Sequence, residues 1–423
     1  MTFKFEWNEF ADQPHNVAPR RERLKHHLMH AGTYLSLAGA NLKRAVPILS
    51  GYRRYWRNIY KTPVNLGTPF GVAVTPAAGR SEEIIQNLKD TGSRQTLVRL
   101  PSWDMQNFST YERFLDQLRK EGFEVTLSLL QRRDDVVNPP SWRVFLEGAF
   151  DRFRTLSSHF EIGHAWNRTK WGVWDHTEYL RLALTAVELA QKYGVKLAGP
   201  AVIDFEFHLY PPLLRVLPFD KVTSLLYVDR MGAPENSQFG WDTSRKIALL
   251  KAVVDASARK SRDVWITEVN WPLQGSGKYS PASGKPNVTE EEQADYLVRY
   301  FILTLASGLI ERVYWWQLVA PGYGLVDSRE PGWRRRPSYR AFQTIVRLLD
   351  RSLFVGSSRA GEGRIFFFSR ENESWALCWT PGRPLDYSFS RPVKKVVSRD
   401  GEEMSRPAEC IRIERSPKYV FFG

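Results

Sequence analysis

The chain has 423 residues, of which 43% are hydrophobic, and a formal net charge of +14. This length exceeds one ordinary domain and suits a barrel of about 250–300 residues with additional segments. The sequence contains no Cys/His cluster and no nucleic-acid-binding motif, so we expect no metal, no cofactor and no nucleic-acid partner. The positive charge instead favours a polyanion such as an acidic polysaccharide or an anionic lipid.

The first residues lack the basic segment and apolar core of a signal peptide, and no apolar run approaches the about 20 residues that span a bilayer. We therefore expect a cytoplasmic protein that is peripheral to the inner membrane. The two cysteines, Cys378 and Cys410, allow either one disulfide or two buried thiols.

Residues 1–61 form a basic segment with eleven Lys/Arg against four Asp/Glu. Its apolar residues recur at helical spacing, which predicts a helix with one apolar face. The favoured interpretation is a helix that packs on the main domain; the alternative is a basic amphipathic helix that contacts a membrane or an assembly partner. The apolar positions are Leu24, Leu28, Ala31, Leu35, Ala38 and Leu42.

Residues 62–350 alternate short apolar strands with helical patterns, which indicates a parallel sheet. Eight such units, with no Gly-rich nucleotide loop after the first strand, predict a closed (β/α)₈ barrel rather than a doubly wound sheet. Residues 351–423 change to short strands separated by turn residues and predict a small, sandwich-like β-domain. The expected barrel strands are 67–75, 93–101, 123–131, 158–166, 195–206, 222–230, 263–271 and 311–318.

Catalytic residues of such barrels stand at the C-terminal ends of the strands. Glu268 is the strongest candidate, because it follows the apolar run 264–266 and precedes Trp271, as suits a nucleophile in a sugar site. The alternative is a structural salt bridge, for example to Arg99. The other ionisable or polar strand-end candidates are Glu161, His164, Asp204, Glu206, Tyr227, Asp229 and Asn270.

These segments resemble clan A glycoside hydrolases, especially the family 39 type with its appended β-domain, and a bacterial subgroup associated with envelope or exopolysaccharide genes. The resemblance covers about residues 65–423. It implies that Glu268 is the nucleophile of a retaining reaction and that Arg99 and Tyr227 hydrogen-bond it. It also implies that Trp315 or Trp316 floors the sugar site. Its strongest elements are LVRLP (97–101), FEIGHAWNR (160–168), ITEVNWP (266–272) and VYWWQL (313–318).

The fourth strand departs from the family pattern, which ends there in Asn-Glu with Glu as the acid/base. In this sequence His164 and Ala165 occupy those two positions, and an alanine cannot donate a proton. Glu161 is the expected substitute, provided that the strand is shifted or cut short. His164 is a second possibility, and a carboxylate from the fifth strand end (Asp204 or Glu206) is a third. A substrate with a good leaving group would need no acid at all.

The sequence thus predicts a retaining glycosidase or transglycosidase that acts on a bacterial cell-surface glycan, such as lipopolysaccharide, capsule or exopolysaccharide, in an anionic or lipid-linked form. Its expected catalytic residues are Glu268 and Glu161. The alternative is a glycan-binding or assembly protein that has kept the barrel without its acid/base. The expected substrate-binding residues are Arg99, His164, Asn167, Asp204, Glu206, Tyr227, Asn270, Trp271, Trp315 and Trp316.

Overall fold

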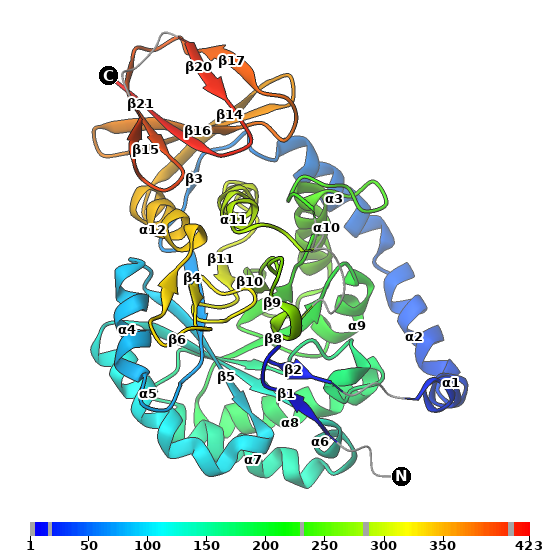
Figure 1. The fold of residues 1–423 in the computed structure, drawn as a ribbon. Helices are drawn as coiled ribbons and strands as arrows, with labels where there is room; N and C mark the ends of the chain where they lie inside the picture. The colour runs from blue at the N-terminus through cyan, green and yellow to red at the C-terminus, as the bar shows by residue number, and fades with distance from the viewer. Residues whose placement is uncertain (1–4, 16–18, 229–231, 282–286, 405–409) are drawn as a thin grey trace.

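The computed structural model describes residues 5–15, 19–228, 232–281, 287–404 and 410–423. Eight parallel strands close a barrel in the order β10-β11-β4-β5-β6-β7-β8-β9, which confirms the predicted (β/α)₈ fold (Figure 1). Each strand is short and almost entirely buried, as expected where helices cover a parallel sheet. The strands are β4 (Phe70–Val74), β5 (Gln95–Pro101), β6 (Glu124–Leu130), β7 (His159–Ile162), β8 (Leu197–Ile203), β9 (Lys221–Leu225), β10 (Val264–Val269) and β11 (Arg312–Trp315).

Helices cover the outside of the barrel and bury one face each. In α5 the buried residues recur at helical spacing, from Phe108 and Tyr111 to Leu118. Helix α8 begins where the Asp175 side chain accepts from two backbone amides, and it ends at Gly194, which has a φ of 66°. The main outer helices are α4 (Ser81–Asp90), α5 (Phe108–Lys120), α7 (Pro139–Phe153), α8 (His176–Tyr193), α9 (Tyr210–Leu214), α10 (Thr243–Ser257), α11 (Glu290–Leu305) and α12 (Pro337–Leu349).

Strand β10 has an irregularity that matters for the site. Its pairing with β11 shifts register between Ile266 and Val269. Such a shift disrupts the simple alternation of side chains. Thr267 and Glu268, although adjacent, therefore both contact groups inside the barrel: Thr267 bonds to Glu161, and Glu268 bonds to Arg99.

The C-terminal strands form a separate seven-stranded sheet in the order β19-β18-β21-β16-β15-β14-β3. The two-stranded sheet of β17 (Leu385–Ser388) and β20 (Cys410–Ile413) accompanies it, and a second apolar cluster includes residues from both sheets. Cys378 is buried whereas Cys410 is exposed, and both thiols are free. The sheet strands are β3 (Val64–Asn65), β14 (Leu353–Ala360), β15 (Gly363–Arg370), β16 (Glu373–Trp379), β18 (Val393–Ser398), β19 (Glu403–Met404) and β21 (Lys418–Phe422).

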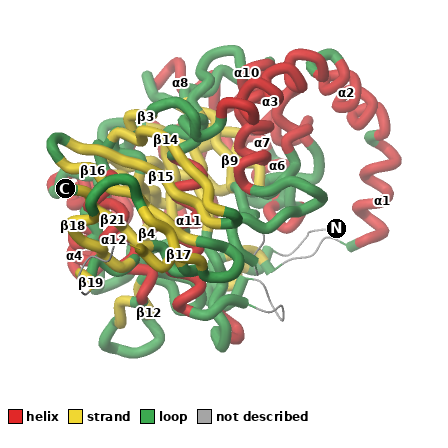
Figure 2. The backbone as a smooth tube through the Cα atoms, turned by 90° about the horizontal axis from the view of Figure 1, so that it is seen from above, coloured by secondary structure: helices red, strands yellow, loops and turns green. Residues whose placement is uncertain are grey.

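The basic N-terminal segment forms three helices, α1 (Arg20–Met29), α2 (Ala31–Leu42) and α3 (Ala45–Asn58). They lie along one side of the molecule, with α1 and α2 at its outer edge (Figures 1 and 2). His26 anchors α1 through an ion pair of 2.7 Å with Asp175, and the buried Leu37 and Ile48 belong to the main core cluster. No helix among the described residues is long and apolar enough to cross a membrane.

The segment packs on the main domain, as the favoured interpretation predicted, but not through the predicted apolar face. The leucines that define that face are exposed, from 58% for Leu24 to 78% for Leu42. The physical reason is that the chain breaks at His30 and again at residues 43–44, so one helical stripe does not continue through the segment. The helices instead contact the barrel through other residues, Leu37 and Ile48 among them.

A short hairpin precedes α1 and lies against the barrel (Figure 1). It pairs β1 (Trp7–Asn8) with β2 (Gln13–Pro14) in antiparallel register. The Asn8 side chain accepts from the backbone amides of Phe10 and Ala11, which fixes the turn between the strands. Ala11 is buried, with 4% exposure.

Candidate active site

A cavity of about 250 Å³ lies at the C-terminal ends of the barrel strands. This volume is slightly below the about 300–1,000 Å³ of pockets for drug-sized ligands, so the cavity suits one small polar group such as a single sugar ring. Its walls combine strand ends with the N-terminal hairpin. The lining residues are Ala11, Asp12, Gln13, Arg99, His164, Ala165, Arg168, Lys170, Trp171, Ile203, Tyr227, Glu268, Asn270, Pro281, Trp316 and Tyr323.

Glu268 reaches this cavity from the end of β10 and is 7% exposed. The Tyr227 hydroxyl donates to its Oε1 at 2.6 Å, and the Arg99 guanidinium donates to its Oε2 at 2.5 Å. Charge-assisted hydrogen bonds of this kind hold a carboxylate in one orientation. Glu268, Arg99 and Tyr227 are therefore in contact, as the family resemblance implied. The contact with Arg99 is also the salt bridge that the structural alternative predicted.

Arg99 is the centre of the site, because its two terminal nitrogens serve different groups. Nη2 donates to Glu268 and lies 2.9 Å from His164 Nε2, whereas Nη1 donates to the Asp12 carboxylate at 2.9 Å. The guanidinium carbon lies 3.4 Å from the centre of the Trp316 ring, a cation–π contact. One buried cation thus joins two carboxylates from distant parts of the chain.

His164 is held as a neutral acceptor. Because the guanidinium has only donors, the contact between Arg99 and His164 Nε2 requires an unprotonated nitrogen there. Burial lowers the pKa of His164 well below its usual value, and the positive charges of Arg99 and Lys170 lower it further. Its Nε2 also lies 3.4 Å from Glu268 Oε2. This arrangement contradicts the alternative in which that nitrogen donates a proton to substrate.

Glu161 is not among the described residues that line the cavity. It points into the barrel, where it is 1% exposed and accepts hydrogen bonds from Ser128 at 2.8 Å and from Thr267 at 2.6 Å. Burial raises its pKa. Strand β7 does end early, at Ile162, but Glu161 remains beneath the site. The geometry contradicts its predicted role as the acid/base.

Asp204 and Glu206 also lie outside the lining and pair with Arg168, Asp204 at 2.6 Å. Asn167 donates to the other oxygen of Glu206 at 3.0 Å. These three predicted residues thus form a polar cluster that supports Arg168, itself a lining residue.

The remaining predicted residues divide between the cavity and the core. Asn270 lines the cavity and donates to the backbone oxygen of Trp316 at 2.7 Å. Trp316 lines it too, whereas Trp315 and Trp271 stack on each other in the core cluster, with ring centres 6.2 Å apart. Trp316 is therefore the tryptophan that can face a sugar. Asp229 lies outside the described residues.

Several lining residues escaped the sequence prediction. Arg168 and Lys170 directly follow the fourth strand, so their position after a strand end was an available signal. Tyr323 belongs to the loop after β11. Asp12 and Gln13 carried no signal, because nothing in the local sequence joins residues 5–15 to the barrel mouth.

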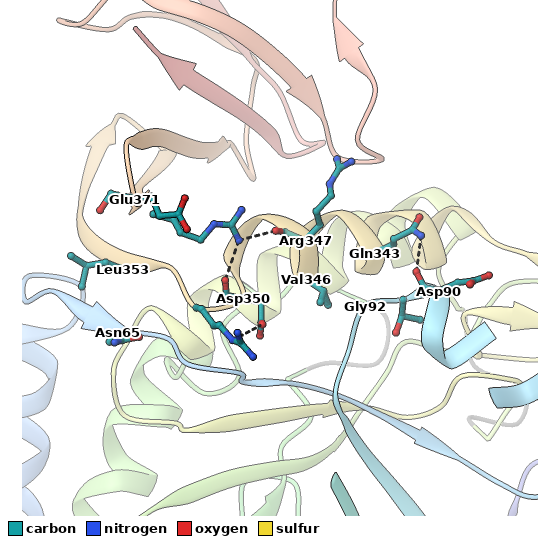
Figure 3. Close-up of a pocket in the computed structure, with 13 residues that line it drawn as sticks. Asn65, Asp90, Gly92, Gln343, Val346, Arg347, Asp350, Leu353 and Glu371 are labelled. Carbon is teal, nitrogen blue, oxygen red and sulfur yellow. Dashed lines mark hydrogen bonds and ion pairs between the residues drawn. The ribbon is translucent and has the colours of Figure 1, made fainter. Parts of the chain in front are cut away.

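Two other features of the described residues resemble binding sites. A larger hollow of about 980 Å³ lies between α12 and the C-terminal sheet (Figure 3), near the starts of the barrel strands, where this fold does not place catalysis. Ligand atoms of His26, His30 and Asp175 lie within 4.8 Å of one another. The hydrogen bond between His26 and Asp175 and the stacking of the His26 and His30 rings account for that proximity.

Comparisons with known proteins support the fold. No family model matches the chain, and no curated protein matches it. Among solved structures, a family 39 glycoside hydrolase from Bacteroides cellulosilyticus WH2 is similar over 85% of this chain and 81% of its own, with a TM-score of 0.68 and 16% identity. A GH30 endoxylanase from Clostridium papyrosolvens C71 is similar over 86% of this chain and 98% of its own (TM-score 0.60, 10% identity). A GH51 arabinofuranosidase from Xanthomonas axonopodis pv. citri is similar over 85% of this chain and 96% of its own (TM-score 0.54, 11% identity).

The chain therefore has a (β/α)₈ barrel with an appended β-domain, as predicted, and this fold is similar to that of the three glycoside hydrolases. At these identities the likeness concerns the fold. What the protein does with it rests on its own site residues.

Proposed function

We propose that this protein is a retaining glycosidase whose nucleophile is Glu268. One observation carries the proposal: a carboxylate at the end of β10 faces a cavity of sugar-ring size and is held by Arg99 and Tyr227. In the reaction, Glu268 attacks the anomeric carbon and forms a glycosyl-enzyme, which water then hydrolyses. A sugar acceptor in place of water would make the same step a transglycosylation.

The proposed substrate is the end of an acidic bacterial cell-surface glycan, such as lipopolysaccharide, capsule or exopolysaccharide. The support comes from shape and charge. The cavity is small and partly covered by the hairpin, which suits a chain end, and the Lys170 ammonium is among its lining groups. The net charge of +14 attracts polyanions to the whole surface. We expect the KM for an acidic glycan to rise with ionic strength and the KM for a neutral analogue to stay constant.

The test of the nucleophile uses a panel of activated aryl glycosides and fluorosugars that trap a glycosyl-enzyme. We expect the wild type to gain the mass of one sugar on the peptide that contains Glu268, and Glu268→Gln to lose turnover by a factor on the order of 10⁴ or more. Glu188→Gln, an exposed carboxylate change on α8, is the matched control. Unaltered turnover in Glu268→Gln would refute the proposal.

Ala165, at the position of the usual acid/base, favours a second candidate function. In that case the protein binds a glycan without cleaving it. Two results together would favour this function over catalysis. The protein would turn over none of the activated glycosides, and it would bind a glycan saturably in a way that Trp316→Ala abolishes.

The proposed location is the surface of an anionic membrane, reached through α1 and α2. Leu28 and Leu35 are 70% and 75% exposed, and Arg21, Lys25 and Lys43 stand on the same segment. Apolar side chains flanked by cations suit an interface where lipid chains meet anionic headgroups.

Vesicles that contain phosphatidylglycerol test this location by co-sedimentation. We expect the wild type to bind them and Leu28→Glu/Leu35→Glu to lose most of that binding. Leu184→Glu, at an exposed leucine on α8, serves as the control and should bind as the wild type does. Equal binding by all three proteins would exclude α1 and α2 as the contact surface.

A further inference from the structure

The N-terminal hairpin closes one side of the candidate active site. Trp7 packs on Trp103 and Trp171, with ring centres 5.2 and 6.0 Å apart. Phe10 contacts Tyr279 from the loop after β10, with ring centres 5.5 Å apart. These contacts hold the hairpin from two sides, so its turn has a defined position over the cavity.

The turn brings Asp12 into the cavity. Asp12 has a φ of 51°, in the left-handed region that aspartate tolerates better than most residues. Its carboxylate contacts Arg99 Nη1 at 2.9 Å, while Glu268 occupies Nη2 of the same guanidinium. The Asp12 backbone oxygen accepts from Nη1 as well, at 3.1 Å. The two carboxylates thus stand next to each other across one arginine.

Asp12 and Glu268 are the two carboxylic acids among the described residues that line the cavity. The position of the usual acid/base is Ala165, Glu161 bonds to Ser128 and Thr267 beneath the site, and the Nε2 of His164 accepts from Arg99.

We propose that Asp12, supplied by the N-terminal hairpin, is the general acid/base of this enzyme. The inference rests on the proposed glycosidase function. In the first step Glu268 bonds to the anomeric carbon, the glycosidic C–O bond breaks, and the leaving oxygen takes the Asp12 proton. In the second step water bonds to the same carbon, its proton passes to the Asp12 carboxylate, and the ester bond to Glu268 breaks.

The protonation of Asp12 suits an acid. Burial raises its pKa to about 6, the Glu268 charge contributes in the same direction, and Arg99 opposes them. Burial also raises the pKa values of the Tyr111 and Tyr323 phenols, and the charge of Asp12 contributes in the same direction. His164 and Lys170 are further titratable groups that line the same cavity. Because the acid must be protonated for the first step, kcat/KM should fall as the pH rises above about 6.

The experiment compares Asp12→Asn with Glu9→Gln, an exposed carboxylate in the same hairpin. Both are assayed on a poor and a good aryl leaving group attached to the same sugar. We expect Asp12→Asn to lose about 10²- to 10⁴-fold in kcat/KM on the poor leaving group and much less on the good one. On the good leaving group, where hydrolysis of the glycosyl-enzyme limits the variant, azide should raise kcat and yield a glycosyl azide, because azide attacks the glycosyl-enzyme without base assistance. The fall above pH 6 should disappear. Glu9→Gln should match the wild type.

The outcomes separate this inference from the function beneath it. The function stands if the wild type turns over activated glycosides and Glu268→Gln does not. In that case Asp12 is not the acid if Asp12→Asn lowers kcat/KM equally on both leaving groups and azide does not raise its turnover. If neither the wild type nor any variant turns over a glycoside, the proposed glycosidase function is wrong, and the inference about Asp12 is wrong with it. Near-ultraviolet circular dichroism of Asp12→Asn excludes misfolding as the cause of a loss.

Discussion

The barrel and the N-terminal hairpin each hold one carboxylate on Arg99, but they hold it by different means. Glu268 stands on β10, which is paired on both sides within a closed sheet. Asp12 stands on a turn between two-residue strands, fixed by aromatic contacts and by Arg99 itself. A rigid scaffold thus positions one group, and an appended segment completes the site. Chemistry that depends on both groups depends on the hairpin staying docked.

The largest expected effect comes from removing the cation that joins the two regions. Arg99→Met leaves two carboxylates close together without their partner, so we expect the free energy of unfolding at pH 7 to fall by about 3–5 kcal/mol. Denaturation by urea measures it. Arg143→Met, which breaks an exposed ion pair with Glu188, is the control and should cost at most about 1 kcal/mol. An equally small loss for Arg99→Met would mean that the hairpin does not depend on this contact.

The sequence predicted the barrel well because its elements are set by local patterns. The strand predicted at 93–101 spans Gln95–Pro101 in the structure, and the strand predicted at 123–131 spans Glu124–Leu130. The contacts among Glu268, Arg99 and Tyr227 follow from the rule that strand ends meet at one rim.

The contact between Asp12 and Arg99 and the buried position of Glu161 depend on information that local sequence patterns do not contain. Asp12 reaches Arg99 across 87 positions of sequence, through a turn without hydrophobic periodicity. The sequence predicted Glu161 as a strand-end residue, but the depth of a side chain in the barrel depends on the stagger of neighbouring strands. The irregularity in β10 then gave Glu161 a partner in Thr267.

Replacing Glu161 sharpens the contrast with Asp12. Glu161→Gln puts an amide NH₂ against one of two hydroxyl donors, Ser128 or Thr267, so we expect a loss of about 1–3 kcal/mol in stability. The kcat of the folded enzyme should stay close to that of the wild type on both leaving groups. A loss in kcat/KM confined to the poor leaving group, together with a kcat on the good leaving group that azide raises, would instead return the acid/base role to Glu161.

The smallest expected effect concerns the outer helices. Helix α2 has one exposed leucine and one leucine buried against the barrel, so the two can be compared directly. Leu35 is 75% exposed, so Leu35→Ala should change the free energy of unfolding by no more than about 0.5 kcal/mol. Leu37 is 8% exposed and belongs to the core cluster, so Leu37→Ala should cost about 2 kcal/mol or more. Thermal denaturation of the two variants side by side gives the difference. A substantial loss from Leu35→Ala would mean that this leucine is covered in solution, for example by a second molecule. An apolar side chain that contributes nothing to the folded chain is available to a partner surface, which is why the same residue serves in the vesicle experiment.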